Sequence, residues 1–186
     1  MKITSVRAYA IKIPPANAGA IEGNRNVEAY GDYTIAADAW TSIYSRNHET
    51  CLVRLETDDG LVGWGEGQAP VSGRATAAIV EDLCTPLLMG RDPFDVEYIW
   101  YRLYSAMRER GHVTGFYVDA LAGVDLALYD LLGKALGKPV YKLLGGNFRP
   151  DVPIYAGMGG TAPEPVAAQA LSLLDAGYRA LKLHLR

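Results

Sequence analysis

The sequence predicts an α+β fold: a three-stranded antiparallel meander with a helical bundle, followed by one β-α-β unit. Three observations support this prediction. Side chains near the amino terminus alternate with the period of two that is typical of a strand. Apolar residues in the middle of the chain recur with the helical period of about 3.6 residues. After about residue 150, a strand pattern, a helix pattern and a second strand pattern follow one another.

The predicted meander has three strands. Residues 2–13 alternate as a strand until Pro14-Pro15 ends it. Two further strands are predicted at Thr50–Glu56 and Leu61–Glu66. The Asp59-Gly60 pair between them is a strong hairpin signal, because glycine accepts the positive φ angle that such turns require. One face of the first strand is expected to carry Ile3, Ser5, Arg7, Tyr9, Ile11 and Ile13.

The segment from about Ala16 to Asn47 has neither a helical nor a strand period. A stretch of this length without regular structure is uncommon in a compact domain unless it is a functional flap. Arg25 lies in this flap, and a guanidinium group binds carboxylates through two parallel hydrogen bonds. His48 follows at the flap side of the next strand. Arg25 and His48 are therefore candidate substrate-binding residues, with ordinary surface positions as the alternative for both.

Three helices are predicted after the meander. The first covers residues 73–88. The second is expected to begin at Asp92-Pro93, since aspartate caps helix N-termini and proline fits the first turn. Its predicted buried face consists of Val96, Ile99, Trp100, Leu103, Tyr104 and Met107. The third helix runs from about Gly115 to Leu136, with Gly137 just beyond its end. Its predicted buried face consists of Ala120, Val124, Ala127, Leu128, Leu131 and Leu132, and Gly123 allows another element to pack closely.

The last part of the chain predicts a β-α-β unit after a linker at residues 147–151. Its strands are expected at Val152–Ala156 and Ala180–Leu185, with a helix from about Thr161 to Ala176 between them. The second strand carries Lys182 and His184 two residues apart, and side chains at that spacing share one face of a strand. Two convergent basic groups on an apolar strand indicate a site; the alternative is a structural or exposed pair.

Composition excludes several classes of function. The net charge of −3 and isoelectric point near 5.6 provide no basic surface for nucleic acid. No stretch approaches the roughly 18 apolar residues of a membrane span, and no leader segment is recognisable at the amino terminus. Cys51 and Cys84 have no Cys or His at metal-binding spacing, so reduced thiols and a cytoplasmic location are expected. No residue of the chain is predicted to bind a metal.

Four motifs, in one order along the chain, resemble the enolase superfamily, and in particular its mandelate racemase and muconate-lactonizing branch. They are Gly63–Glu66 (GWGE), Ala122–Lys134 (AGVDLALYDLLGK), Gly137–Pro139 (GKP) and Leu143–Gly146 (LLGG). The resemblance implies a capping domain over residues 1–150 and a modified TIM barrel, (β/α)7β, that begins at residue 151. Residues 151–186 would be the first β-α-β unit of a truncated barrel.

The resemblance also implies a chemistry, the abstraction of a proton α to a carboxylate. Mg²⁺ stabilises the enediolate in this family, and its carboxylate ligands come from the third, fourth and fifth barrel strands, which these 186 residues do not contain. Lys182 matches the first lysine of a Lys-x-Lys motif, which lies beside the substrate carboxylate. His184 occupies the place of the second lysine, the general base, and departs from the common pattern. It either accepts a proton or only hydrogen-bonds the substrate.

The leading expectation is the N-terminal part of a Mg²⁺-dependent acid-sugar dehydratase that acts on a small-molecule carboxylate and forms a homo-oligomer. A racemase, epimerase or cycloisomerase of the same branch is the alternative. A non-catalytic product that serves as a binding or assembly module is another. The 186-residue chain alone, as a truncated product or fragment, is expected to be inactive. Structural roles are expected for Trp64, Glu66, His112, Asp125 and Asp130.

Overall fold

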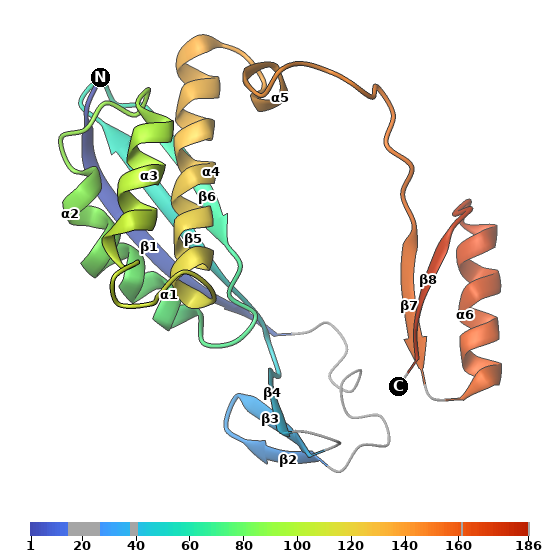
Figure 1. Ribbon diagram of the computed structural model, residues 1–186. Coiled ribbons are helices and arrows are strands. Elements are labelled where there is room, and N and C mark those ends of the chain that lie inside the picture. Colours follow the sequence, from blue (N-terminus) through green and yellow to red (C-terminus); the bar gives the residue numbers. More distant parts are fainter. Residues whose placement is uncertain (15–26, 38–40, 161, 186) are drawn as a thin grey trace.

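The computed structural model describes residues 1–14, 27–37, 41–160 and 162–185. Its main sheet has three antiparallel strands in the order β1-β5-β6, where β1 is Ile3–Ile13, β5 is His48–Thr57 and β6 is Val62–Gly67 (Figure 1). Gly60 has φ +84° in the hairpin between β5 and β6. The predicted meander is therefore confirmed, including its turn.

The side chains of β1 do not alternate along its whole length as predicted. The register with β5 shifts between Ile3 and Ser5, which marks a bulge at this point. The bulge puts Ile3 on the same side as Val6 and Ala8, which lie opposite Leu55 and Val53 and pack against the core. The predicted continuous face from Ile3 through Ser5 and Arg7 was wrong, because one extra residue reverses the alternation.

The flap contains a second sheet that the sequence did not predict. Its antiparallel strands are β2 (Val27–Tyr30), β3 (Tyr33–Ala37) and β4 (Thr41–Ser45), in the order β2-β3-β4. A two-residue turn joins β2 to β3, and Gly31 has φ +57° in it. Strands of four or five residues are too short to show a clear period in a sequence rich in small and polar residues.

Helices cover one face of the main sheet. The first predicted helix is α1 (Gly73–Ile79), η1 (Val80–Cys84, a π-helical turn) and α2 (Thr85–Leu88) in direct succession. The third is α4 (Phe116–Leu136), which Gly137 ends with φ +59°, and its predicted buried face is confirmed. No helix in the described residues is long and apolar enough to cross a membrane.

The second helix, α3 (Val96–Ala106), begins four residues later than Asp92. Asp92 instead forms a turn before the helix: its Oδ1 accepts a hydrogen bond from the Phe94 N–H at 3.0 Å. Trp100 was predicted to be buried, but it is 40% exposed and stacks on Tyr104 at 5.0 Å between ring centroids. An aromatic residue beside the buried stripe satisfies the helical period without entering the core.

The backbones of α4 and β6 pack closely against each other. Three glycines, Gly63, Gly65 and Gly67, form the face of β6 toward the helix, opposite Leu55, Val53 and Cys51 of β5. A Cβ atom on Gly65 would overlap the Gly123 carbonyl oxygen and lie 2.6 Å from the Ala127 nitrogen. The missing side chains therefore let the helix backbone rest directly on the strand (Figure 1).

The carboxyl-terminal unit stands apart from the main sheet and is joined to it through α5 (Val140–Leu143) and an extended stretch (Figure 1). It consists of β7 (Ala156–Gly160), α6 (Pro163–Asp175) and β8 (Leu181–Leu185), with β7 and β8 parallel. The first strand of this unit was predicted at Val152–Ala156, but β7 begins only at Ala156. Its pairing with the described part of β8 starts with Ala156 and Leu181, so the residues before Ala156 have no partner in that strand.

We expect Gly65→Ala to lower the free energy of unfolding by at least about 3 kcal/mol, because the new methyl group must force α4 away from β6. Urea unfolding followed by circular dichroism measures this loss. Gly157→Ala is the matched control, since nothing lies within 4 Å of a Cβ atom there. Its effect should stay below about 1 kcal/mol. Equal effects of the two substitutions would contradict the close contact between α4 and β6.

Candidate functional site

The sheet formed by β7 and β8 has one covered and one open face. Ala156 and Met158 are buried on the side of α6. The register pairs Gly157 with Lys182 and Gly159 with His184, so these positions alternate with the buried ones and belong to the other face. Nothing lies within 4 Å of a Cβ atom on Gly157. On this face the charged Lys182 therefore lies beside Gly157, which has no side chain.

The Lys182 ammonium group is available for an anion. Its Nζ lies 5.7 Å from the centroid of the Tyr155 ring, which is the geometry of a cation–π contact. No carboxylate in the described part of the chain forms an ion pair with Lys182. A ring positions the ammonium group without neutralising its charge, so Lys182 can bind the carboxylate of a small molecule.

The structure brings together only two of the predicted site residues, Lys182 and His184. Lys182 and His184 occupy alternate positions of β8, as predicted. Arg25 lies outside the described residues. His48 is the exposed first residue of β5 and pairs with Ile13, so it belongs to a different sheet from Lys182. The roles of all four residues stay predictions.

A buried carboxylate that sequence reasoning missed joins the flap to the main sheet. The side chain of Glu49 is fully buried. It accepts hydrogen bonds from Ser45 Oγ at 2.6 Å and from the Gly73 N–H at 3.1 Å, and Lys12 Nζ lies 3.5 Å away. Lys12 also binds Asp32 at 2.8 Å. Glu49 thus connects β4, β1 and the start of α1 through one side chain.

The pKa of Glu49 results from opposing effects. Burial alone would raise it, but the hydrogen bonds from Ser45 and Gly73 and the charge of Lys12 outweigh burial and hold the pKa below its ordinary value of 4.5. A sequence signal for this residue exists. Glu49 has the same parity in β5 as Cys51, Val53 and Leu55, so it is a charged residue at a position that alternation assigns to the core.

The remaining polar candidates have structural roles. Asp130 accepts hydrogen bonds from the Trp64 N–H at 2.8 Å and from Lys134 Nζ at 2.6 Å, as expected of a backbone partner. Glu66 accepts a hydrogen bond from Thr50 Oγ1 at 2.6 Å. The Trp64 ring lies 5.9 Å from that of Tyr9, on the sheet face opposite α4.

Two other candidates lie among the helices. His112 is exposed in the irregular segment between α3, which ends at Ala106, and α4, so the helix-end position expected for it was wrong. Asp125 is half-buried in α4, and burial and the nearby Glu97 raise its pKa. Neither residue belongs to a group of ligands. In the part of the chain that the structure describes, no three His, Cys, Asp or Glu side chains are grouped to hold a metal ion.

Comparison with known proteins identifies the family. Residues 32–145 match the model of the mandelate racemase / muconate lactonizing enzyme N-terminal domain. The chain belongs to this family of the enolase superfamily. Residues 32–145 are accordingly the N-terminal domain of an enolase-superfamily protein, and they include β3 to β6 and the helices α1 to α5.

Two curated relatives of this chain are named for different activities. A D-galactonate dehydratase of Verminephrobacter eiseniae is 42% identical over 72% of this chain. An N-succinyl-L-Arg/Lys racemase of Bacillus cereus is 31% identical over 98% of this chain. The chain spans 34% and 44% of the lengths of these two proteins. The family therefore includes dehydratases and racemases with sequences similar to this one.

A solved structure extends the comparison to the carboxyl-terminal unit. A racemase of Streptomyces coelicolor with bound magnesium is 30% identical, with a TM-score of 0.73, over 97% of this chain and 46% of its own. The similarity thus includes nearly all of the described fold, and this relative binds magnesium.

We expect Glu49→Gln to lower the free energy of unfolding at pH 7 by about 1–2 kcal/mol, because the amide loses the charge that its hydrogen-bond donors favour. The folded-state pKa is depressed, so the stabilisation exists above pH 4.5 and disappears as the pH falls through the folded-state value. Urea unfolding between pH 7 and pH 3 measures both effects.

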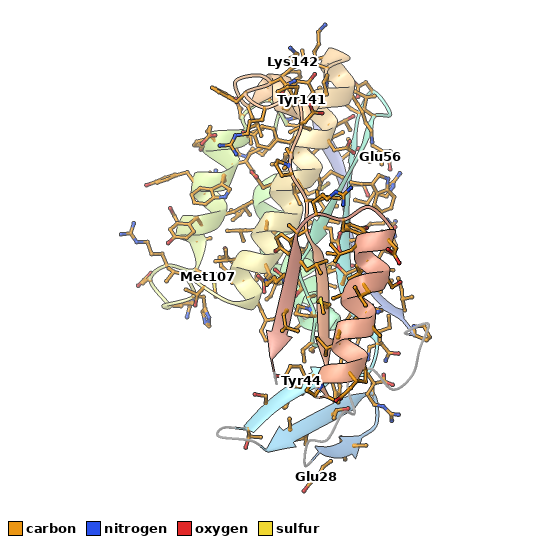
Figure 2. The ribbon with its side chains drawn as sticks, turned by 90° about the vertical axis from the view of Figure 1, so that its right-hand side faces the viewer. Glu28, Tyr44, Glu56, Met107, Tyr141 and Lys142 are labelled. Atoms are coloured by element: carbon orange, nitrogen blue, oxygen red, sulfur yellow. The ribbon has the colours of Figure 1, made fainter. Side chains whose placement is uncertain are left out.

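The exposed Glu28, at the outer edge of the flap sheet, offers the matched control (Figure 2). Glu28→Gln should leave the stability within about 0.5 kcal/mol of the original at every pH. If the cost of Glu49→Gln were the same at about pH 3 as at pH 7, the charge of Glu49 would not be the cause of its stabilising effect.

Proposed function

We propose that this chain is the N-terminal part of a Mg²⁺-dependent dehydratase that removes water from an acid sugar. Residues 1–150 would form its capping domain, and residues 151–186 the first β-α-β unit of a (β/α)7β barrel. The observation that carries the proposal is the Lys182 ammonium group, which has no ion-pair partner among the described residues and lies on the open, glycine-lined face of β7 and β8. The 42% identity to a D-galactonate dehydratase supports the acid-sugar substrate.

The side chains of this strand would act on the substrate carboxylate. Lys182 would bind the carboxylate and stabilise the negative charge that develops when the α-proton leaves. His184, at the next position of the same face, would exchange a proton with the substrate near neutral pH or hydrogen-bond its hydroxyl groups. Mg²⁺ would supply further charge stabilisation. Since the described residues provide no ligand group for it, the 186-residue chain alone is expected to be inactive.

A racemase is the second candidate, and a specific observation favours it. The Bacillus cereus and Streptomyces coelicolor racemases match 98% and 97% of this chain, whereas the match to the D-galactonate dehydratase covers 72%. Both reactions begin with abstraction of a proton α to a carboxylate. They differ in whether a hydroxyl group then leaves from the neighbouring carbon or a proton returns to the α-carbon.

Incubation of the complete protein with Mg²⁺ in D₂O distinguishes these candidates. D-galactonate and N-succinyl amino acids would be supplied separately and followed by proton NMR. A dehydratase converts the acid sugar into a 2-keto-3-deoxy acid. A racemase replaces the α-proton by deuterium and leaves the carbon skeleton and its substituents unchanged. If neither substrate class reacts or exchanges its α-proton, both proposals fail and a non-catalytic binding or assembly module becomes the better description.

Lys182→Ala in the complete protein should lower kcat/KM by about 10²- to 10³-fold, because the developing charge loses its cation. Lys182→Arg, which keeps the charge, should recover part of this loss. Lys138→Ala removes an exposed lysine near the end of α4 and is the matched control, with activity expected within about twofold of the original. Activity unchanged by Lys182→Ala would eliminate this residue from the site.

A further inference from the structure

The flap sheet, β2-β3-β4, is attached to the main sheet by polar contacts. Neither of the two apolar clusters of buried residues in the described chain contains a residue of these three strands. Figure 1 shows the flap sheet beyond the end of the main sheet where β1 finishes and β5 begins. The position of the flap sheet relative to β1 therefore depends on hydrogen bonds and charges, and Lys12 is at their centre.

Lys12 has one partner that belongs to the main sheet. Lys12 of β1 and Glu49 of β5 are directly opposite each other in the register of the two strands, and Lys12 Nζ lies 3.5 Å from Glu49 Oε1. The Glu49 side chain is fully buried. A buried carboxylate that lost its cation would be left uncompensated at a high cost in free energy. Glu49 therefore keeps the Lys12 ammonium group beside the start of β5.

The other partners of Lys12 belong to the flap sheet. Lys12 Nζ donates a hydrogen bond to Asp32 Oδ2 at 2.8 Å, and it lies 5.2 Å from the centroid of the Tyr33 ring. Asp32 is in the turn between β2 and β3, and Tyr33 begins β3. The Asp32 side chain is 57% exposed, in contrast to the buried Glu49. An ion pair as exposed as this contributes little to stability, so it breaks more easily than the contact with Glu49.

The neighbouring charges keep both members of this exposed pair ionised. The hydrogen bond from Lys12 lowers the pKa of Asp32, and the Asn47 side chain and the Arg46 charge lower it further. The same hydrogen bond, with a smaller effect from Glu49, raises the pKa of Lys12. The pair is therefore charged at neutral pH. Dissolved salt screens an exposed pair of this kind, whereas a change of pH near neutrality leaves it intact.

We propose that Lys12, Glu49 and Asp32 form an electrostatic latch for the flap sheet: Glu49 fixes the ammonium group to the main sheet, and the Asp32 contact breaks when the flap sheet turns away from β1. Ser45, the last residue of β4, donates a hydrogen bond to Glu49 at 2.6 Å, and the Asn47 N–H donates one to Ser45 Oγ at 3.1 Å. These bonds hold the junction of β4 and β5 together, so the flap sheet turns about this junction.

The two carboxylates of the latch have different effects. Loss of the Asp32 contact leaves Lys12 with its buried partner, so no buried charge loses its counterion and the contact re-forms when the flap sheet returns. The apolar core of the main sheet and its helices keeps its packing during this motion. Opening is thus a local event with a smaller free energy than unfolding of the whole chain. Asp32 determines the position of the flap sheet, whereas Glu49 also stabilises the fold.

A pair of spin labels on the complete protein measures the fraction of molecules with an open flap sheet. Glu28→Cys on β2 and Lys138→Cys after α4 place the labels at exposed positions of the flap sheet and of the helical layer. Cys51 and Cys84 are buried, so they stay unlabelled. Double electron–electron resonance then gives the label-to-label distances of the closed and open forms without substrate. The result is therefore independent of the proposed reaction.

Asp32→Asn should raise the ratio of open to closed molecules about two- to fivefold, the range expected for an exposed ion pair. Raising the salt concentration from about 20 mM to about 500 mM should have a similar effect on the original protein and little effect on Asp32→Asn. Asp32→Asn should leave the midpoint of urea unfolding unchanged, whereas Glu49→Gln should lower it. Glu56→Gln is the matched control, because it removes an ion pair of the same length, 2.8 Å to Arg54, on the main sheet. This control should leave the ratio of open to closed molecules unchanged.

A distance distribution that neither Asp32→Asn nor salt changes would overturn the proposal. The proposal also fails if Glu56→Gln opens the flap sheet as much as Asp32→Asn, because the effect would then come from net charge alone. An equal fall of the urea midpoint in Asp32→Asn and Glu49→Gln would likewise contradict it, since Asp32 would then stabilise the whole fold rather than the position of the flap sheet.

Discussion

The contact of the α4 backbone with β6 determines how the other elements of the capping domain are arranged. Glycines at alternate positions of β6 contact the backbone of Gly123 and Ala127 in the helix, so closely that a Cβ atom on the strand would overlap it. The helix then covers the sheet along its length and packs Val124, Leu128 and Leu131 into the core. The same strand presents Trp64 and Glu66 on its other face. The two glycines of the motif Gly63–Glu66 therefore serve to pack β6 against α4.

A second constraint connects the flap to this framework. Glu49 is buried at the junction of β4 and β5, where its hydrogen bonds reach β4 through Ser45 and the first residue of α1 through Gly73. Lys12 bridges it to Asp32 in the turn between β2 and β3. The flap sheet is thus attached to the main sheet by charges, whereas the helices are attached by apolar packing.

The lysine proposed to bind the substrate belongs to a different unit from the main core. Lys182 lies on the open face of β7 and β8, beside positions that glycine leaves empty. The chain spans less than half the length of the two curated relatives described above, so its capping domain and this cationic strand together correspond to part of a family enzyme. The similarity to a magnesium-bound racemase over 97% of the chain connects both units to one protein fold.

The sequence by itself determined the meander, its hairpin, the three helices, the family and the position of Lys182 and His184 on one strand. Each of these depends on local periodicity, turn chemistry or a contiguous motif. Only the tertiary structure decided the bulge after Ile3, the flap sheet, the exposure of Trp100 and the burial of Glu49. These features depend on partners distant in sequence, because register, short-strand pairing and burial are properties of two surfaces that no single segment specifies.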